Sequence, residues 1–328
     1  MTNSLSTPQA APLQRHDVVD PVTENMVWIP GGTFVMGSDH HYAEEAPAHR
    51  VTVDGFWIDR FPVTNAEFRQ FVDETGHVTF AELEPNAADY PGALPDMLYA
   101  GSLVFTKPPI RVELGNSHQW WSYVRGAQWQ HPRGASSTLA GLGRHPVVHI
   151  TLGDAAAYAA WAGKSLPTEA EWECAARGGL DGAEFAWGDE LTPGGTHMAN
   201  TWQGDFPWQN EQRDGYEYTS PVDAFPPNGY GVFDMIGNVW EWTTDWYRPR
   251  HTKDQVKACC IPQNPRGGSE DASRDPRDVA RVPRKVLKGG SHLCAPNYCR
   301  RYRPAARFPE PIDTSACHVG FRCVVQAR

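Results

Sequence analysis

The sequence has no apolar run long enough to cross a bilayer. A membrane-spanning helix requires roughly 20 consecutive, mainly apolar residues, whereas the mean hydropathy of these 328 residues is −0.52. Cationic residues are also too few for a nucleic-acid-binding surface, because the formal net charge is −10 and phosphate recognition needs an excess of lysine and arginine. We therefore expect no membrane and no nucleic acid among the partners of this protein.

The short motifs of several common enzyme classes are absent as well. The chain contains no Walker, GxSxG or GxGxxG sequence, so nucleotide binding and serine hydrolysis are not predicted. It contains no CxxC pair that would supply a zinc site, and no apparent set of two histidines and one carboxylate for mononuclear iron. It shows neither an internal repeat nor a break in composition, so we expect one domain.

The N-terminal segment lacks the basic region and the apolar core of a secretion signal. It is rich in Ser, Thr, Gln, Ala and Pro instead, and we expect a flexible tail over residues 1–23 ahead of a domain over residues 24–328. The seven cysteines are an odd number, so at least one has no partner within the chain. Free thiols in a reducing compartment are the simplest interpretation, which predicts a cytoplasmic location.

The composition favours an irregular fold. The 30 glycines and 28 prolines favour turns, while the 13 tryptophans and 13 phenylalanines supply large buried anchors. Residues 27–37 predict two strands joined by a Pro-Gly-Gly turn into a hairpin, and residues 51–59 alternate like one half-buried strand. Residues 83–133 show little periodicity but contain three tryptophans, so we expect ordered loops packed by aromatic side chains.

Three segments have the pattern of capped helices. Residues 64–72 place a Thr-Asn cap ahead of an apolar face, and residues 154–161 are rich in alanine. Residues 168–177 begin with a Thr-x-x-Glu capping box formed by Thr168 and Glu171. Residues 259–278 are polar and are expected to form an excursion over the surface.

A segment near the C-terminus combines reactive side chains. Residues 288–303 hold Cys294 and Cys299, five positions apart, among a hydroxyl, phenols and four cationic side chains. Thiolates are soft ligands for soft metals, and nearby cations lower the pKa of a thiol. The residues alone leave three interpretations open: two buried structural thiols, a disulfide, or two ligands of a soft ion such as two-coordinate Cu(I).

Two other segments gather oxygen-bearing side chains around glycine turns. Asn200 and Thr201 are followed by Asp214 and Tyr216, and residues 234–241 hold a second such cluster. Hard cations such as Ca²⁺ bind carboxylate, amide and backbone carbonyl oxygens. Asx-type turns also explain such clusters, and neither spacing matches an EF-hand loop, so the residues alone favour turns over calcium.

Motifs along nearly the whole chain after the tail resemble the formylglycine-generating enzymes that activate sulfatases. They lie at residues 27–32, 62–65, 163–173, 226–231, 237–242 and 320–323. Several belong to a wider superfamily that includes non-catalytic members and iron-dependent sulfoxide synthases, so these motifs indicate the fold and not the activity. Cys294 and Cys299 match the paired active-site cysteines of the family, and both are present.

This resemblance implies a single compact α+β domain, rich in loops and low in regular secondary structure, with the formylglycine-generating enzyme or C-type-lectin-like fold. It implies a copper-dependent oxidase that uses O₂. The substrate would be an unfolded sulfatase polypeptide, whose cysteine within Cys-x-Pro-x-Arg becomes Cα-formylglycine, with a thiol reductant as a further partner. The alternative is a non-catalytic module of the same fold that binds peptides or glycans.

The resemblance also assigns roles to residues of the active site. Cys294 and Cys299 would hold Cu(I), Ser291 and Tyr298 would line the oxygen pocket, and Trp240 would form its wall. Without the resemblance, a turn-capping serine and two core aromatic residues would be the simpler interpretations.

Two more residues belong to this implied site. Arg301 would bind nearby anionic or polar groups, although a solvated surface charge is the simpler interpretation from sequence alone. His318 stands where the family often has asparagine, which gives it a different protonation behaviour and leaves its role open.

Calcium becomes the favoured interpretation of the oxygen clusters once the resemblance is taken into account. The two implied sets are Asn200, Thr201, Asp214 and Tyr216, and Asp234, Gly237, Val239 and Glu241. Two disulfides of secreted family members are not expected, because Ala159, Ala176 and Pro304 occupy three of the four cysteine positions. The cysteines without an assigned role are expected to be free thiols: Cys174, Cys259, Cys260 and Cys317.

Overall fold

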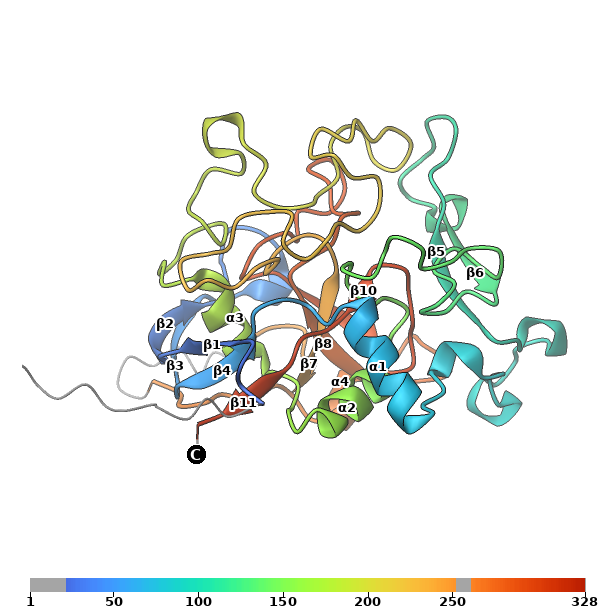
Figure 1. Ribbon diagram of the computed structural model, residues 1–328, viewed down its shortest axis with the longest axis horizontal. Coiled ribbons are helices and arrows are strands. Elements are labelled where there is room, and N and C mark those ends of the chain that lie inside the picture. Colours follow the sequence, from blue (N-terminus) through green and yellow to red (C-terminus); the bar gives the residue numbers. More distant parts are fainter. Residues whose placement is uncertain (1–21, 252–260, 328) are drawn as a thin grey trace, which may run out of the picture.

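The computed structural model describes residues 22–251 and 261–327 (Figure 1). Most of the predicted tail, together with Cys259 and Cys260, lies outside this range. Short strands and helices are joined by long loops, with β7 and β8 near the centre of the molecule and the β5–β6 ribbon at one side. The predicted loop-rich α+β fold is confirmed. No helix in the described part of the chain is long and apolar enough to span a membrane.

The first four strands belong to two segments of the chain, β1–β2 and β3–β4, and each segment bends between its two strands. β1 (Met26–Ile29) pairs with β4 (Phe56–Asp59), which also pairs with β11 (Val324–Gln326), whereas β2 (Gly32–Met36) pairs with β3 (His49–Val53). The predicted hairpin between residues 27–29 and 32–36 is therefore wrong, and the single strand predicted over residues 51–59 is two strands.

The strands pair in this way because the two segments bend at the same place. Gly31 has a φ of 70°, and a Cβ atom there would lie 2.5 Å from the carbonyl oxygen of Val53. Only glycine allows this close approach of two backbones. Both segments bend at the same point, so each strand finds its partner across the corner and not across the Pro-Gly-Gly turn.

A four-stranded sheet carries the cysteine segment. Its order is β10 (Val319–Gly320), β7 (Trp240–Trp246), β8 (Arg284–Lys288) and β9 (Arg307–Pro311), and only β10 and β7 are parallel. The cysteine segment follows β8 directly. Trp240 N donates to His318 O at 2.8 Å, and His292 N donates to Asn238 O at 3.0 Å. The sheet thus brings the predicted residues Trp240 and His318 to the same end as the cysteines.

The three predicted helices are confirmed. α1 (Asn65–Thr75) and α3 (Glu169–Arg177) begin with capping boxes at Thr64 and Thr168. α2 (Leu152–Trp161) begins two residues earlier than predicted, because Thr151 and Asp154 form a third capping box. α4 (Glu270–Ser273) lies in the predicted surface excursion. Short 3₁₀ turns complete the helical elements: η1 (Ala43–Glu45), η2 (Phe80–Glu82), η3 (Ala87–Asp89), η4 (Pro95–Met97), η5 (Ser117–Gln119) and η6 (Pro193–Gly195).

The stretch of low periodicity contains a ribbon that the sequence pattern does not predict. β5 (Gly101–Phe105) and β6 (Trp121–Arg125) pair antiparallel, with Phe105 opposite Trp121. Trp120 and Trp129 are buried, as the prediction of aromatic packing requires. An aromatic cluster joins the ribbon to the cysteine segment; its buried members are Phe105, Trp120, Trp202, Phe206, Leu293 and Ala295.

Candidate active site

The two predicted cysteines meet in space without bonding. Cys294 Sγ and Cys299 Sγ lie 3.4 Å apart, and both are free thiols. A disulfide bond would require about 2.05 Å. Cys294 is only 2% exposed, whereas Cys299 is partly buried. Of the three interpretations that the residues leave open, the structure excludes a disulfide between these sulfurs.

The local fold of the segment produces this approach. Gly290, with a φ of 73°, turns the chain at the end of β8. Cys294 N donates to Ser291 O at 2.9 Å, and Cys299 N donates to Ala295 O at 2.9 Å. These two turns carry Cys299 back over Cys294. Hydrogen bonds between residues three and four positions apart therefore bring together two cysteines that are five positions apart in the sequence.

The two thiols titrate differently. Burial raises the pKa of Cys294 well above its usual value. The hydrogen bond from Cys294 and the nearby guanidinium of Arg301 lower the pKa of Cys299 to about 6. At neutral pH the pair therefore holds one thiolate, which is stabilised by the neighbouring thiol. Two soft sulfur atoms in one buried place fit a soft ion such as Cu(I).

Arg301 is held in place on several sides. Its Nη1 lies 3.8 Å from Cys299 Sγ, and its Nη2 donates to Glu44 Oε1 at 2.6 Å. Its guanidinium carbon lies 3.8 Å from the ring centre of Tyr42, a favourable cation–π position. The structure thus places Arg301 beside the thiolate and does not leave it as a solvated surface charge.

The other three predicted pocket residues differ in their surroundings. Ser291 is fully buried, and its Oγ accepts a hydrogen bond from Leu293 N at 3.2 Å, so it caps the turn. Tyr298 is 42% exposed, and its ring stacks on Phe206 with centroids 4.5 Å apart. Trp240 is buried in the central sheet. Tyr298 is therefore the one of these three that faces solvent beside the sulfurs.

His318 lies against the ribbon. Its ring centre is 4.9 Å from that of Trp121. Burial, followed by repulsion from His292 and His149, lowers its pKa to about 3. Its Nδ1 is buried and has no partner among the described residues. At neutral pH the ring is uncharged, so it offers a polar atom and not a cation.

Sequence reasoning missed the acidic partners of the arginine run. Glu44 pairs with Arg301, and the neighbouring Glu45 makes two hydrogen bonds with Arg303, at 2.6 and 2.8 Å, in the buried interior. The sequence shows an adjacent pair of glutamates and, far along the chain, a cluster of arginines of opposite charge. This pattern does not reveal which arginine each glutamate contacts.

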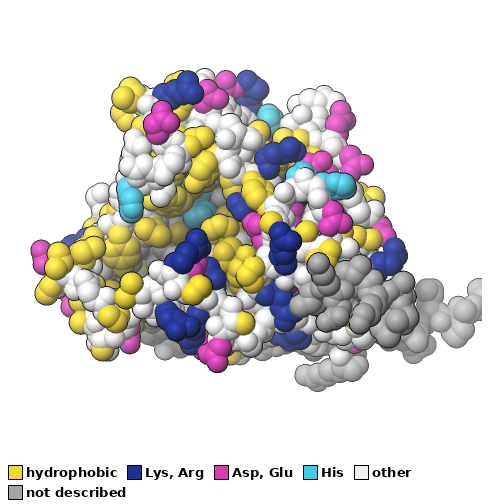
Figure 2. Space-filling model, turned by 180° about the vertical axis from the view of Figure 1, so that it is seen from behind, with side chains coloured by type: hydrophobic (Ala, Val, Ile, Leu, Met, Phe, Trp, Pro, Cys, Tyr) yellow, Lys and Arg dark blue, Asp and Glu magenta, His cyan; other side chains and the backbone are white. Residues whose placement is uncertain are grey.

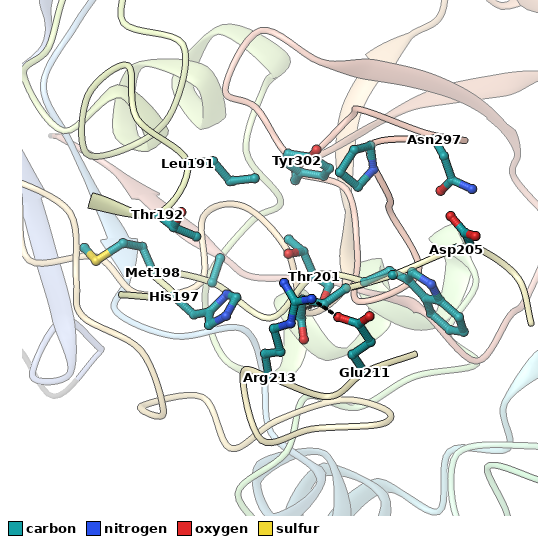
Figure 3. A pocket seen from close by; sticks show the side chains of 15 residues that line it. Leu191, Thr192, His197, Met198, Thr201, Asp205, Glu211, Arg213, Asn297 and Tyr302 are labelled. Carbon is teal, nitrogen blue, oxygen red and sulfur yellow. Dashed lines mark hydrogen bonds and ion pairs between the residues drawn. The ribbon is translucent and has the colours of Figure 1, made fainter. Parts of the chain in front are cut away.

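A cavity of about 400 Å³ opens beside the cysteine loop (Figure 3). Pro296 and Asn297, which lie between the two cysteines, and Tyr302 form one wall. Arg213 and Glu211 form an ion pair on the opposite side. Neither sulfur belongs to the lining among the residues that the structure describes, so this cavity adjoins the cysteine pair without opening onto it.

Asp214 is the centre of the first predicted calcium set. Its Oδ1 accepts a hydrogen bond from Tyr216 N at 3.0 Å, and its Oδ2 accepts one from Gln203 Nε2 at 2.7 Å. The same amide of Gln203 donates to the carbonyl oxygen of Thr201. The carboxylate of Asp214 and the carbonyl of Thr201 therefore both point at the side-chain NH₂ group of Gln203. Such an arrangement of oxygens also suits a hard cation.

The second predicted calcium set contains two buried carboxylates. Burial raises the pKa of Asp234 to about 7, and Asn238 Nδ2 donates to its Oδ2 at 2.9 Å. Glu241 is held by Arg322, which donates to both carboxylate oxygens at 2.7 and 2.8 Å. Asp234 thus fits a cation that would keep it ionised, whereas the charge of Glu241 already has a partner.

The backbone connects the two sets. Asn238 N donates to Asn200 O at 2.9 Å, and Gly237 and Val239 flank Asn238 in the same turn. Within the described ranges, no three His, Cys, Asp or Glu side chains gather closely enough to hold a metal ion. Calcium at either place would therefore depend on amide and backbone oxygens as well as carboxylates.

Comparison with known proteins places the chain in a family. Residues 13–327 match the model of the sulfatase-modifying factor enzyme 1-like domain. The chain belongs to this sulfatase-modifying factor family. It is 52% identical over 300 residues to a formylglycine-generating enzyme of Mycobacterium tuberculosis, an alignment that covers 91% of this chain and 97% of the relative.

The sulfatase-modifying factor family also includes relatives without activity. A bovine protein named inactive C-alpha-formylglycine-generating enzyme 2 is 44% identical over 306 residues, covering 92% of this chain and 88% of the relative. Among solved structures, PvdO from Pseudomonas aeruginosa aligns with a TM-score of 0.61 at 24% identity, over 96% of this chain and all of PvdO, which supports the fold alone. Activity must therefore be argued from the site.

Proposed function

We propose that this chain generates Cα-formylglycine by oxidising a cysteine of a sulfatase polypeptide within Cys-x-Pro-x-Arg. The observation that carries the proposal is the pair of unbonded sulfurs 3.4 Å apart, with the guanidinium of Arg301 beside Cys299. Relatives named formylglycine-generating enzymes support the reaction type. The copper, the O₂ and the exact substrate motif are parts of the proposal.

Cys294 and Cys299 would hold Cu(I). When bound there, Cu(I) supplies a soft site for the substrate thiol and a route for electrons to O₂. Overall, the β-carbon of the substrate cysteine is oxidised to an aldehyde and its sulfur leaves as hydrogen sulfide. O₂ is reduced to water with electrons from the substrate and from a thiol reductant.

The residues of the chain prepare the site for this chemistry. Arg301 balances the negative charge of the Cys299 thiolate, and Glu44 fixes the guanidinium in position. The ring of Tyr298, the neighbour of Cys299 in the sequence, stacks on Phe206 and places an aromatic surface beside the cysteine segment. Ser291 holds the turn that presents Cys294.

We also infer that Ca²⁺ binds the two oxygen clusters and stabilises the loops that support the cysteine segment. Trp202 N donates to Cys294 O at 3.1 Å, one residue after Thr201 of the first set. His292 N donates to Asn238 O, between Gly237 and Val239 of the second set. Each set is thus one hydrogen bond away from the segment that carries the sulfurs. The cytoplasm remains the proposed location.

The test is turnover of a Cys-x-Pro-x-Arg peptide, followed by mass spectrometry, with Cu(I)-loaded protein, O₂ and a thiol reductant. We expect aldehyde formation by the wild type and none by Cys294→Ser or Cys299→Ser, which should also lose Cu(I) binding. Cys174→Ala, at another buried free cysteine, is the matched control and should remain active. Full activity in either serine variant would refute the proposal, whereas peptide binding without any turnover by the wild type would favour the non-catalytic module.

A further inference from the structure

A small cavity of about 20 Å³ lies apart from the cysteine pair, and neither active-site cysteine lines it. Three of its lining residues have side chains that can bind a metal: Met36 at the end of β2, His49 at the start of β3 and His251 in the chain after β7. We call these three residues the imidazole–thioether cluster. The cavity is large enough for one water molecule or one ion.

The cavity is lined by two imidazoles whose Nε2 atoms are buried and unpartnered. His49 is 5% exposed and His251 is 8% exposed. Nε2 of each ring is buried and has no hydrogen-bond partner among the described residues. Because buried polar atoms nearly always have a partner, two such nitrogens at one small cavity indicate that a ligand or a water molecule belongs there.

The fold brings the three side chains of the imidazole–thioether cluster together. Met36 and His49 lie directly opposite each other in the β2–β3 ladder, so their side chains project from the same face of the pair. The ring centre of His251 lies 4.7 Å from that of His49. A Cβ atom at Gly37 would lie 3.4 Å from Nε2 of His251, so this nitrogen lies beside the end of β2.

The segment that follows η1 holds both imidazoles. His251 N donates to Ala46 O at 3.0 Å, and His49 Nδ1 lies 2.9 Å from Pro47 O. Because a carbonyl oxygen only accepts, Nδ1 of His49 carries the hydrogen and its Nε2 keeps a lone pair. Burial and, after it, the charge of Arg307 lower the pKa of His251 well below its usual value. An uncharged imidazole is the form that binds metals.

The charged residues of the cavity wall limit which ligand fits. Arg307 pairs with Glu169 at 2.7 Å, and Arg266 pairs with Asp245 at 3.0 Å. Arg248 also lines the cavity and has no carboxylate partner among the described residues, so the wall is net positive. A positive wall opposes a divalent ion more than a univalent one. Thioether and imidazole ligands suit Cu(I), whereas Zn²⁺ usually takes four ligands. The wall and the ligands together favour a soft univalent ion.

We propose that the imidazole–thioether cluster is a second site for Cu(I), separate from the cysteine pair. Its ligands are Nε2 of His49, Nε2 of His251 and the sulfur of Met36. Among the described residues, no three His, Cys, Asp or Glu side chains form a metal site, and this set differs because its third ligand is a methionine. The site lets the protein hold copper apart from the two thiols. The inference does not depend on the oxidase reaction, because it concerns other residues.

The experiment measures Cu(I) binding without oxygen, by competition with a coloured Cu(I) chelator. The parent protein is the full chain without its paired and adjacent thiols, and it carries Cys259→Ser, Cys260→Ser, Cys294→Ser and Cys299→Ser. We expect this parent to bind one equivalent of Cu(I), and we expect His49→Gln or His251→Gln in the parent to lose it. Met36→Leu keeps the side-chain volume and both imidazoles, so it should weaken binding by about tenfold.

Histidine side chains also lie at the surface, as Figure 2 shows for one face of the molecule. His118→Gln, at an exposed position, is the matched control and should leave Cu(I) binding unchanged. X-ray absorption at the copper edge should show nitrogen neighbours and one sulfur in the parent, and no sulfur in Met36→Leu.

Three results would overturn the inference. The folded parent could bind no Cu(I), which would assign the cavity to a water molecule. Both histidine variants could bind Cu(I) as tightly as the parent. The absorption spectrum could show sulfur neighbours alone, which would place the ion on other cysteines. Circular dichroism checks the fold of each variant; if a histidine variant does not fold, Met36→Leu and the spectrum of the parent decide. Because the parent lacks Cys294 and Cys299, the outcome is independent of the proposed oxidase activity.

Discussion

Cys299 Sγ lies 3.8 Å from Nη1 of Arg301, and the opposite end of the same guanidinium pairs with Glu44 at 2.6 Å. The three groups form a row of alternating charge: a thiolate, a cation and a carboxylate. Each end of the row is fixed by a different part of the chain, since Glu44 belongs to η1 and Cys299 follows β8. The hydrogen bond from Cys294 and, after it, the cation of this row lower the pKa of Cys299 against the effect of burial.

The ionisation of Cys299 can be measured directly. In copper-free protein, we expect the rate of alkylation of Cys299 to be half-maximal near pH 6, because its pKa is about 6 and only the thiolate reacts. Below that pH the thiol is protonated and the rate falls. Peptide mass spectrometry across a pH series gives the profile for each cysteine, and Cys294 should remain unreactive over the same range because burial raises its pKa.

Arg301→Gln serves as the variant for this measurement. Loss of the cation should move the midpoint of Cys299 upward, while the hydrogen bond from Cys294 remains and keeps it below that of an ordinary thiol, about 8.5. A wild-type midpoint near 8.5, or an unchanged midpoint in Arg301→Gln, would contradict the charge row described above.

Calcium removal should lower thermal stability. A ligand that binds only the folded state stabilises it by about 2.7 kcal/mol at a concentration of 100 Kd, so chelation is expected to lower the Tm and added Ca²⁺ to restore it. Asp214→Asn should reduce this response, because Asp214 is the central carboxylate of the first set. Asp271→Asn, at a carboxylate that is 98% exposed, is the control. Melting curves that do not respond to chelation would exclude both sites.

The helices show what the sequence reveals about the fold. The boxes at Thr64 and Thr168 join residues three positions apart, so the pattern identifies the start of each helix. Strand pairing depends on distant partners instead. Ile29 pairs with Phe56 and Gly32 pairs with Val53, because both segments bend at a shared corner that no local pattern encodes.

The same difference between local patterns and distant contacts applies to the active site. Cys294 and Cys299 were identifiable because they lie only five positions apart, so two consecutive local turns bring them together. Glu44 was not, because 257 residues separate it from Arg301 and several glutamates have the same local sequence character.

A buried ion-pair cluster anchors the strand that leads to the cysteines. Glu173 accepts hydrogen bonds from Lys288 at 2.9 Å, from Arg177 at 2.7 Å and from Gly37 N at 2.8 Å. Glu173→Ala leaves Arg177 with backbone carbonyls alone and Lys288 with only the more distant Glu169, at 3.9 Å, and we expect a loss of about 3–5 kcal/mol in the free energy of unfolding. Urea denaturation measures it, with Glu113→Ala, at an exposed position, as the control. A loss below 1 kcal/mol would mean that the cations find other partners.

The pH dependence of this cluster has a defined sign. Burial alone would raise the pKa of Glu173, but Lys288 and Arg177 outweigh it, and the pKa lies below its usual value. The carboxylate therefore stabilises the fold above the pKa of the unfolded chain, about 4.3, and this contribution is lost as the pH falls through the lower, folded-state pKa. Unfolding titrations from pH 7 to pH 3 should show a smaller decline for Glu173→Ala than for the wild type.

Gly290 connects this strand to the sulfurs, and its replacement tests whether the turn itself positions them. A Cβ atom there would lie 2.7 Å from the carbonyl oxygen of Arg301, at a φ of 73° that disfavours other residues. Gly182 has a similar φ of 78° but no atom within 4 Å of its Cβ position, so Gly182→Ala measures the backbone strain alone, about 1–2 kcal/mol. We expect Gly290→Ala to cost more stability than Gly182→Ala. It should also move the alkylation midpoint of Cys299 upward, because the Arg301 backbone must shift away from the sulfur. Equal stability losses, with the midpoint unchanged, would show that the cysteine pair does not depend on this close backbone contact.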